Sequence, residues 1–297
     1  MGWAPGRVAV GVAGALVVAA MGGGARWGEA GHVMAGRAAA SRLPAEMPQF
    51  FRVAPDRLGW LNPEPDRWRA DAMVEANEAF RYDHYIDLEV VPEAIRAARD
   101  RFEYLSALQR TGMQRPSREA GLLPFRIIEM QQRLTIGFAQ WRRTTDARER
   151  EWLEHRILDD AGILGHYATD AANPHHTTIH HNGWAENTPN PDGYTTERTF
   201  HWRFENEFVG SHITFEELLV RLDGDARQFV NVRDDVWQFL RSSHAKVDQL
   251  YRLEKQEMFG PDTQSGAHEA FALDRLAAGT DFLRSLWWTA WLNSATL

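Results

Sequence analysis

Several pairs of residues in this chain place a histidine four positions before a carboxylate, and two of them have further residues of metal-ligand type around them. These two pairs are His166 with Asp170 and His201 with Glu205. Residues four apart share one face of an α-helix, so each pair can present a nitrogen and an oxygen to one metal ion or to two adjacent ions. A single pair of this kind is typical of a solvated helix surface. Two pairs, together with other ligand-type residues, favour a multi-metal site inside a helical bundle.

Other residues of metal-ligand type surround the two pairs. Pro174 breaks the helix that carries His166 and Asp170. His176 follows in the loop, from where it can turn back toward the helix. Three more lie nearer the N-terminus: His32, Asp66 and His84. The chain has no cysteine, which excludes thiolate nucleophiles, disulfides and cysteine–zinc sites. A site made from His, Asp and Glu suits zinc in a catalytic role rather than in a zinc finger.

The order of these residues resembles that of a known family, the superfamily of zinc-dependent phospholipase C and the single-strand-specific nucleases of fungi and plants. The core signature of the family is His-x3-Asp-x3-Pro-x-His, followed by a closing His-x3-Asp or Glu. The core signature is matched by His166, Asp170, Pro174 and His176, and the closing pair by residues 201 and 205.

The N-terminal part of the family motif is also matched. A Trp at the mature N-terminus and a His shortly after it correspond to Trp27 and His32. An Asp in a loop corresponds to Asp66, and a His-aromatic-x-Asp stretch to residues 84–87. The resemblance therefore runs from residue 27 to about residue 209, and the rest of the chain adds compatible helices.

The resemblance implies a site for three zinc ions. The ligands of the first ion would be Asp66, His84, His166 and Asp170. The ligands of the second would be His176, His201 and Glu205. The third would be held by His32, Asp170, and the amine and carbonyl of Trp27, so that Asp170 bridges two ions. Zinc lowers the pKa of bound water to about 7, and Asp66 would orient or deprotonate that water as the catalytic carboxylate.

Some positions leave alternatives open. Signal cleavage after Ala25 would leave Arg26 ahead of Trp27, so either Arg26 is trimmed or the third ion is held differently. Asp71 is an alternative ligand to Asp66, which we prefer for its Pro-Asp-x-Trp context. Several further histidines are either surface residues or neighbours of the site, with substrate contact or a supporting hydrogen bond as the functional interpretation: His155, His175, His180 and His181.

The function that the resemblance implies is phosphodiester hydrolysis. The expected enzyme is a zinc-dependent nuclease that acts on single-stranded nucleic acid or nucleotides, whose bases stack on aromatic side chains. Candidates for stacking are Trp68, Tyr85, Trp184 and Tyr194. A phospholipase C that cleaves phospholipid headgroups is the alternative, favoured by Glu205, since the family's phospholipases carry Glu there. A non-catalytic zinc-binding protein is a second alternative.

The net charge and the N-terminal segment indicate the expected partners and localisation. The 297 residues carry a formal net charge of −8, without the basic surplus of a duplex-DNA-binding protein. Residues 1–25 have the pattern of an export signal, with Arg7, an apolar run over 8–21 and small residues before position 26. We expect a secreted or periplasmic protein with no stable protein partner, not an integral membrane protein once the signal is removed. A short N-terminal anchor helix is the alternative.

The elements that must position these residues are helices. Apolar residues recur with helical spacing, whereas alternating strand patterns of any length are missing. The sequence therefore predicts one all-α domain over residues 26–297, with the metal site among its helices and a polar loop over 182–198. The predicted helices cover residues 31–43, 93–109, 118–143, 146–172, 199–209, 215–222, 230–257 and 269–294.

Overall fold

Helices make up the regular structure of the computed structural model, which describes residue 1 and residues 28–222 and 224–297. Within these ranges no strand forms, and β-type pairing is limited to two isolated bridges, Ile86 with Gly121 and His181 with Gly183. The predicted all-α fold is confirmed. The predicted export signal and Trp27 lie outside the described residues.

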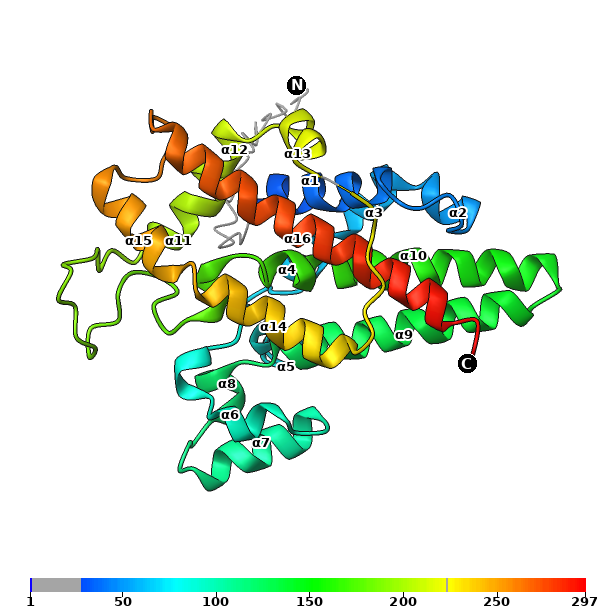
Figure 1. Cartoon of the computed structure of the whole chain (residues 1–297), viewed down its shortest axis with the longest axis horizontal. Coiled ribbons are helices and arrows are strands. Elements are labelled where there is room, and N and C mark those ends of the chain that lie inside the picture. Colours follow the sequence, from blue (N-terminus) through cyan, green and yellow to red (C-terminus); the bar gives the residue numbers. More distant parts are fainter. Residues whose placement is uncertain (2–27, 223) are drawn as a thin grey trace.

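Three long helices form the frame of the molecule: α9 (Leu123–Arg143), α10 (Ala147–Asp170) and α16 (Gly266–Asn293). The first two are an antiparallel pair joined by a short turn, and α16 packs across both (Figure 1). Asp146 caps α10 by accepting hydrogen bonds from the Arg148 and Glu149 amides. Trp287 of α16 is fully buried, and its indole N–H donates to the Ala161 carbonyl of α10 at 3.1 Å.

The remaining helices are shorter and surround this frame. Those before α9 are α1 (Gly28–Ser41), α2 (Gln49–Arg52), α3 (Pro55–Leu61), α4 (Glu64–Arg67), α5 (Val74–Phe80), η1 (Arg81–His84), η2 (Leu88–Val90), α6 (Glu93–Arg96), α7 (Arg101–Arg110) and α8 (Pro116–Ala120). Those after α10 are η3 (Pro174–Thr177), α11 (Phe200–Trp202), the π-helix η4 (Arg203–Phe208), α12 (Val209–His212), α13 (Phe215–Arg221), α14 (Val232–His244) and α15 (Val247–Gln256). In Figure 1, α6, α7 and α8 project away from the long helices.

Three predicted helices are each divided in the structure. The segment 118–143 breaks at Gly121, between α8 and α9. The segment 93–109 forms α6 and α7 because Asp100 caps α7, accepting from the Phe102 and Glu103 amides. The segment 230–257 divides into α14 and α15 after His244. These two helices bury their apolar faces in different hydrophobic clusters, which a single straight helix could not do.

The two hydrophobic clusters include residues of α10 and of η4, the elements that carry Asp170 and Glu205. The larger one fills the space between α9, α10, α14 and α16, and the smaller one lies among α1, η4, α15 and the start of α16. Phe200, Phe204 and Phe208 recur every four residues and are fully buried in the smaller cluster. Each large apolar side chain buried in this way contributes about 1.5–3 kcal/mol.

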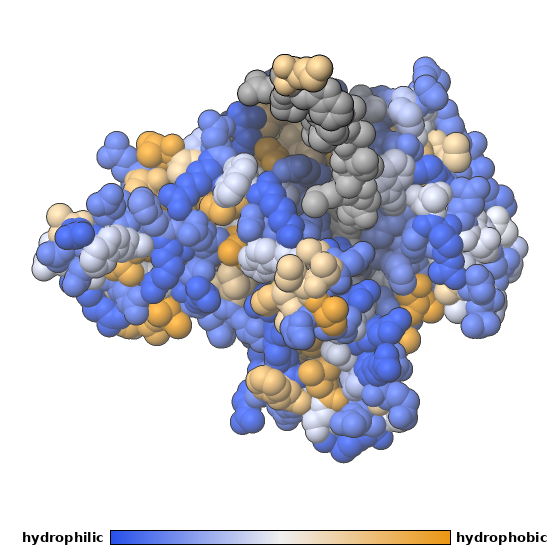
Figure 2. Space-filling view, turned by 180° about the vertical axis from the view of Figure 1, so that it is seen from behind, coloured by the Kyte–Doolittle hydropathy of each residue, from blue (hydrophilic) through white to orange (hydrophobic). Residues whose placement is uncertain are grey.

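The described surface is mixed in hydropathy. The face drawn in Figure 2 is mostly hydrophilic, with hydrophobic residues scattered over it in small groups. None of the helices that the structure describes has both the length and the hydropathy that crossing a bilayer requires.

Candidate metal centre

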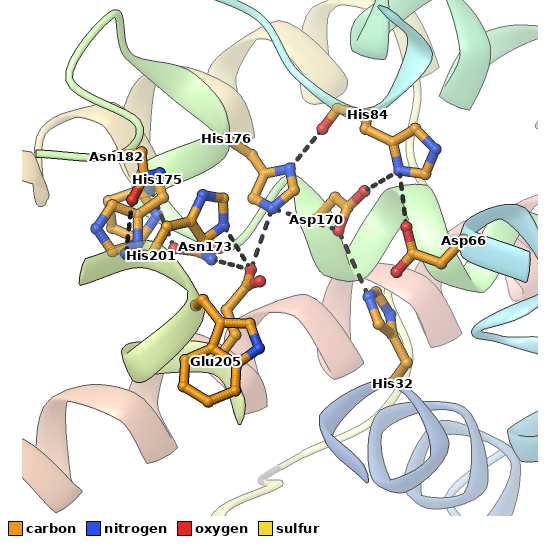
Figure 3. A network of polar contacts seen from close by, with 12 residues as sticks. His32, Asp66, His84, Asp170, Asn173, His175, His176, Asn182, His201 and Glu205 are labelled. Atoms are coloured by element: carbon orange, nitrogen blue, oxygen red, sulfur yellow. Dashed lines mark hydrogen bonds and ion pairs between the residues drawn. The ribbon is translucent and has the colours of Figure 1, made fainter. Parts of the chain in front are cut away.

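The C-terminal end of α10 carries the first ligand pair. His166 and Asp170 lie one helical turn apart and are fully buried. The helix ends at Asp170, and Asn173 then caps η3, accepting from the His175 amide. This turn brings His176 back toward Asp170, as Figure 3 shows. The Ile86 amide donates to the His176 carbonyl at 2.9 Å, which joins η3 to the segment after His84.

The first group of ligand atoms gathers around Asp170 Oδ2 and comprises Asp66, His84, His166 and Asp170. His84 Nδ1 lies 3.1 Å from that oxygen, and His166 Nε2 lies 3.3 Å from it. These two nitrogens are 2.9 Å apart, and each is 3.8 Å from Asp66 Oδ1. Four ligands at zinc-type bond lengths in a tetrahedron are about 3.3 Å apart, so these separations bracket the spacing that one ion requires.

The second group comprises His176, His201 and Glu205. Glu205 Oε1 lies 3.1 Å from His176 Nε2 and 2.9 Å from His201 Nε2. Asn173 Nδ2 donates to the same oxygen at 2.6 Å. His201 and Glu205 each follow a buried phenylalanine of the smaller cluster by one residue, and this register turns both side chains toward η3.

Asp170 stands between the groups. While Oδ2 faces His84 and His166, Oδ1 lies 3.5 Å from His32 Nε2 and 3.7 Å from His176 Nε2. The ring of His32, from α1, stacks on that of His166 with centroids 4.1 Å apart. A third set of atoms that could hold an ion is thus His32, His166 and Asp170. One carboxylate therefore reaches three sets of nitrogens, which arrive from helices far apart in the sequence.

Several buried polar atoms at the centre lack a hydrogen-bond partner among the described residues, and a bound cation would satisfy them. Asp170 Oδ1, Glu205 Oε2 and His32 Nε2 are buried and make no hydrogen bond with the described residues. Burial opposes the ionisation of Asp170, yet the imidazoles of His176 and His166 hold the pKa of its carboxyl well below the ordinary value. Burial also opposes the ionisation of Glu205, and His201 with His176 lowers its pKa. Buried anions whose oxygens lack hydrogen bonds are costly unless a cation is bound.

Two hydrogen bonds orient the histidine rings. His32 Nδ1 donates to Asn62 Oδ1 at 2.9 Å, and His176 Nδ1 donates to the His84 carbonyl at 2.6 Å. Both bonds place the ring proton on Nδ1 and leave Nε2 as the ligand atom. Asn62 fits because residue 165 is glycine: a Cβ there would lie 2.6 Å from Asn62 Nδ2.

We expect Asn62→Ala to weaken metal binding about 10- to 100-fold, since loss of a partner that orients a ligand has effects of this size. The measurement is a zinc titration against a competing chelator. Asn62→Asp, which keeps an acceptor for His32, is the matched control and should bind nearly as tightly as the natural protein. Equal affinity of the alanine variant and the natural protein would contradict an orienting role for Asn62.

The structure brings together every predicted ligand that it describes. These residues are His32, Asp66, His84, His166, Asp170, His176, His201 and Glu205. Trp27, the remaining predicted ligand, lies outside the described residues. Asp66 sits in the short helix α4 rather than in a loop, since prolines at 63 and 65 start that helix. Asp71 is exposed and belongs to none of the ligand groups.

The other histidines near the signature fall into two sets. His175 is fully buried, with its ring stacked on His201 at 4.6 Å, so it is not a loop-surface residue. Burial and the neighbouring His201 lower its pKa well below the ordinary value. His180 is also buried, against Trp184, whereas His155 and His181 are exposed. Asn62 and Asn173, which hold His32 and Glu205, had no signal in the sequence pattern.

A cavity of about 260 Å³ opens beside the second ligand group. His176 and His201 form part of its wall, together with His175 and the exposed His181. The rest of the lining comes from η1, the following segment and α8: Arg81, Tyr82, Tyr85, Asp87 and Arg118. The arrangement gives a small molecule direct access to the ligand side chains.

Fold and site together define an all-α protein in which buried groups of His, Asp and Glu could hold metal ions. No protein-family model, curated protein or solved structure matches the chain. The family resemblance therefore stands on the signature residues and on their order in this sequence.

Proposed function

We propose that this protein is an exported, zinc-dependent phosphodiester hydrolase whose substrate is single-stranded nucleic acid or nucleotides. The observation that carries the proposal is the position of Asp170, whose two oxygens face separate groups of ligand atoms. A carboxylate shared in this way is typical of catalytic multi-metal sites, because it holds ions close enough to act on one phosphate.

Zinc is the ion that the donor atoms suit best. Imidazole nitrogens outnumber carboxylate oxygens in the centre, and neutral imidazole with a few carboxylates is a zinc-type set, whereas magnesium and calcium prefer oxygen alone. We propose three ions, as in the family that the sequence resembles. The third would be completed by the amine and carbonyl of Trp27.

Bound zinc supplies a Lewis acid that lowers the pKa of water and stabilises negative charge on phosphoryl oxygens. Within the first group, Asp66 is the one side chain that solvent reaches, at 17% exposure against 0% for His84, His166 and Asp170. Burial opposes its ionisation, but His166 and His84 hold the pKa of Asp66 below its ordinary value. Asp66 is therefore a carboxylate that can orient an attacking water and accept its proton, and Arg69 lies 3.3 Å from its Oδ1.

The cavity supports nucleic acid as the substrate. Tyr82 and Tyr85 are partly exposed in its wall, where a base could stack on them. Two other candidates for stacking, Trp184 and Tyr194, already contact side chains of the protein itself. Trp184 stacks on His180 at 3.6 Å, and Tyr194 is 5% exposed and donates its hydroxyl hydrogen to Asp248.

Phospholipid headgroup cleavage is the second candidate. Glu205 favours it, because the phospholipases of the resembling family have Glu at this position. A non-catalytic zinc-binding protein is less well supported, since holding zinc requires neither a shared carboxylate nor an accessible cavity beside the ligands. The proposal places the mature protein outside the cytoplasm, after removal of residues 1–25, without a stable protein partner.

One assay tests the proposal and ranks its alternatives. The purified mature protein, loaded with zinc, is incubated with single-stranded DNA, RNA or a choline phospholipid, each with and without a chelator. We expect chelator-sensitive hydrolysis of the nucleic acids. Cleavage of the phospholipid alone would establish the second candidate. Full zinc loading with no hydrolysis of any substrate would overturn the proposed function in favour of a zinc-binding protein.

A further inference from the structure

The cavity beside the second ligand group joins the metal ligands to two arginines. His176 and His201 form one part of its wall, and Arg81 and Arg118 form another. Its volume of about 260 Å³ is large enough for a phosphate group and part of a sugar. A group held by the arginines would thus lie next to a phosphate held at the metal centre.

Backbone hydrogen bonds fix the two arginine-bearing segments to each other. The Leu122 amide donates to the Tyr82 carbonyl at 2.8 Å, and the Asp87 amide donates to the Ala120 carbonyl at 2.8 Å. In addition, the Tyr85 hydroxyl donates to the Arg118 carbonyl at 2.6 Å. The backbone at both arginines is therefore held in place relative to His84, the ligand at the end of η1.

Gly121 allows this close approach. Its φ is +81°, in the left-handed region, and a Cβ at this position would collide with the Tyr85 carbonyl. The segment after Tyr85 is bonded in turn to η3, through the Ile86 amide and the His176 carbonyl. Metal ligands and arginines thus belong to one continuous hydrogen-bonded unit.

The charges of this wall favour an anion. Arg118 is exposed and makes no ion pair within 4.0 Å among the residues that the structure describes, and Arg81 forms an ion pair with the half-exposed Glu78 at 3.0 Å. The charge of Glu78 acts on both arginines. Asp87 also lines the cavity, but burial and the nearby Glu89 raise the pKa of its carboxyl to about 8, so it is mostly uncharged at neutral pH. Guanidinium groups bind phosphate oxygens through paired, charge-assisted hydrogen bonds.

We propose that Arg81 and Arg118 form a subsite for a second phosphate, next to the phosphate that is cleaved. This inference rests on the proposed function and deepens it, because it names the substrate class: a chain with successive phosphates, such as an oligonucleotide. A choline phospholipid has a single phosphodiester and gains nothing from such a subsite. The arginines are specificity residues and take no part in the metal centre.

Hydrolysis of matched dinucleotides tests the subsite. Three are compared: one without a terminal phosphate, one with a 5′-phosphate and one with a 3′-phosphate. We expect Arg118→Ala to raise KM about 10-fold for one of the phosphorylated dinucleotides and less than about 2-fold for the unphosphorylated one, with kcat little changed. The slope of log KM against log salt concentration should fall by about one for the affected substrate.

Two further variants and one binding measurement make the test decisive. Arg115→Ala removes an exposed arginine just before α8 that does not line the cavity, and it should leave all three substrates unaffected. Arg118→Lys keeps the charge without the paired donors and should recover part of the loss. Equal changes in KM for all three dinucleotides would overturn the subsite.

The binding measurement separates this inference from the proposed function. Fluorescence anisotropy of labelled tetrathymidylate reports binding to the chelated protein, in which no hydrolysis occurs. We expect Arg118→Ala to weaken this binding about 10-fold and Arg115→Ala to leave it unchanged. If the natural protein hydrolyses nothing yet binds the oligonucleotide through Arg118, the proposed hydrolysis fails and the subsite stands. Unchanged binding by the Arg118 variant overturns the subsite while leaving hydrolysis to its own assay.

Discussion

Replacing Asp170 with asparagine should lower kcat/KM by at least about 1,000-fold, equivalent to roughly 4 kcal/mol of transition-state stabilisation. An amide keeps the shape of the side chain but removes the negative charge that faces His84 and His166 on one side and His32 and His176 on the other. The zinc content of the isolated protein should fall by at least one ion per chain. Elemental analysis and steady-state kinetics on single-stranded DNA measure the two effects.

Asp159→Asn is the matched control for this variant. Asp159 lies on the same helix, but it is half-exposed and forms a surface ion pair with Arg57 at 2.9 Å. Exposed pairs of this kind contribute at most about 1 kcal/mol, so activity and zinc content should stay close to those of the natural protein. An Asp170 variant with unchanged zinc stoichiometry would refute the shared position of this carboxylate between ions.

Removing the metal should abolish hydrolysis and lower Tm by about 10 °C or more. An ion present at 100 times its Kd stabilises the folded state by about 2.7 kcal/mol, and more than one ion is expected here. In domains of this size each kcal/mol changes Tm by about 2–4 °C. Without a cation, the buried oxygens of Asp170 and Glu205 keep only histidines and Asn173 as partners. Differential scanning calorimetry with and without chelator measures the change.

The Asp170 variant supplies the control for chelation. If the stabilisation comes from ions at this centre, chelator should lower the Tm of Asp170→Asn by less than it lowers that of the natural protein. Re-addition of zinc should restore both Tm and activity to the natural protein. An unchanged Tm in the chelated natural protein would show that the ligand groups fold independently of any ion.

The local part of the site could be predicted because helical spacing is local. His166 with Asp170 and His201 with Glu205 share helix faces by their spacing, and Pro174 marks the turn after α10. The all-α class followed from the same periodicity. The breaks at Asp100, at Gly121 and after His244 were missed because the apolar spacing continues across them. A cap ends the helical run at Asp100, a left-handed glycine at Gly121 and a change of hydrophobic cluster after His244.

The long-range part of the site could not be derived from spacing alone. His32 reaches Asp170 because α1 packs against α10 and α16, and the family motif, not the periodicity, indicated that meeting. Asn62 follows α3, and its hydrogen bond with His32 forms only because the fold brings the two residues together. The same holds for Arg118, which enters the cavity because Gly121 lets its segment approach Tyr85. Residues of this kind have no sequence pattern, since their partners are set by tertiary packing.

The two-sided position of Asp170 would also govern how the protein takes up the proposed ions. An ion on the Oδ2 side would fix the orientation of the carboxylate and withdraw charge from Oδ1. It would therefore change the affinity of the neighbouring site, and the influence would be reciprocal. If fixing the orientation outweighs the loss of charge, loading is cooperative: half-filled chains are scarce and uptake is sigmoidal in free zinc. The proposed activity would then respond to zinc supply as a threshold, appearing only in a compartment where the metal exceeds that level.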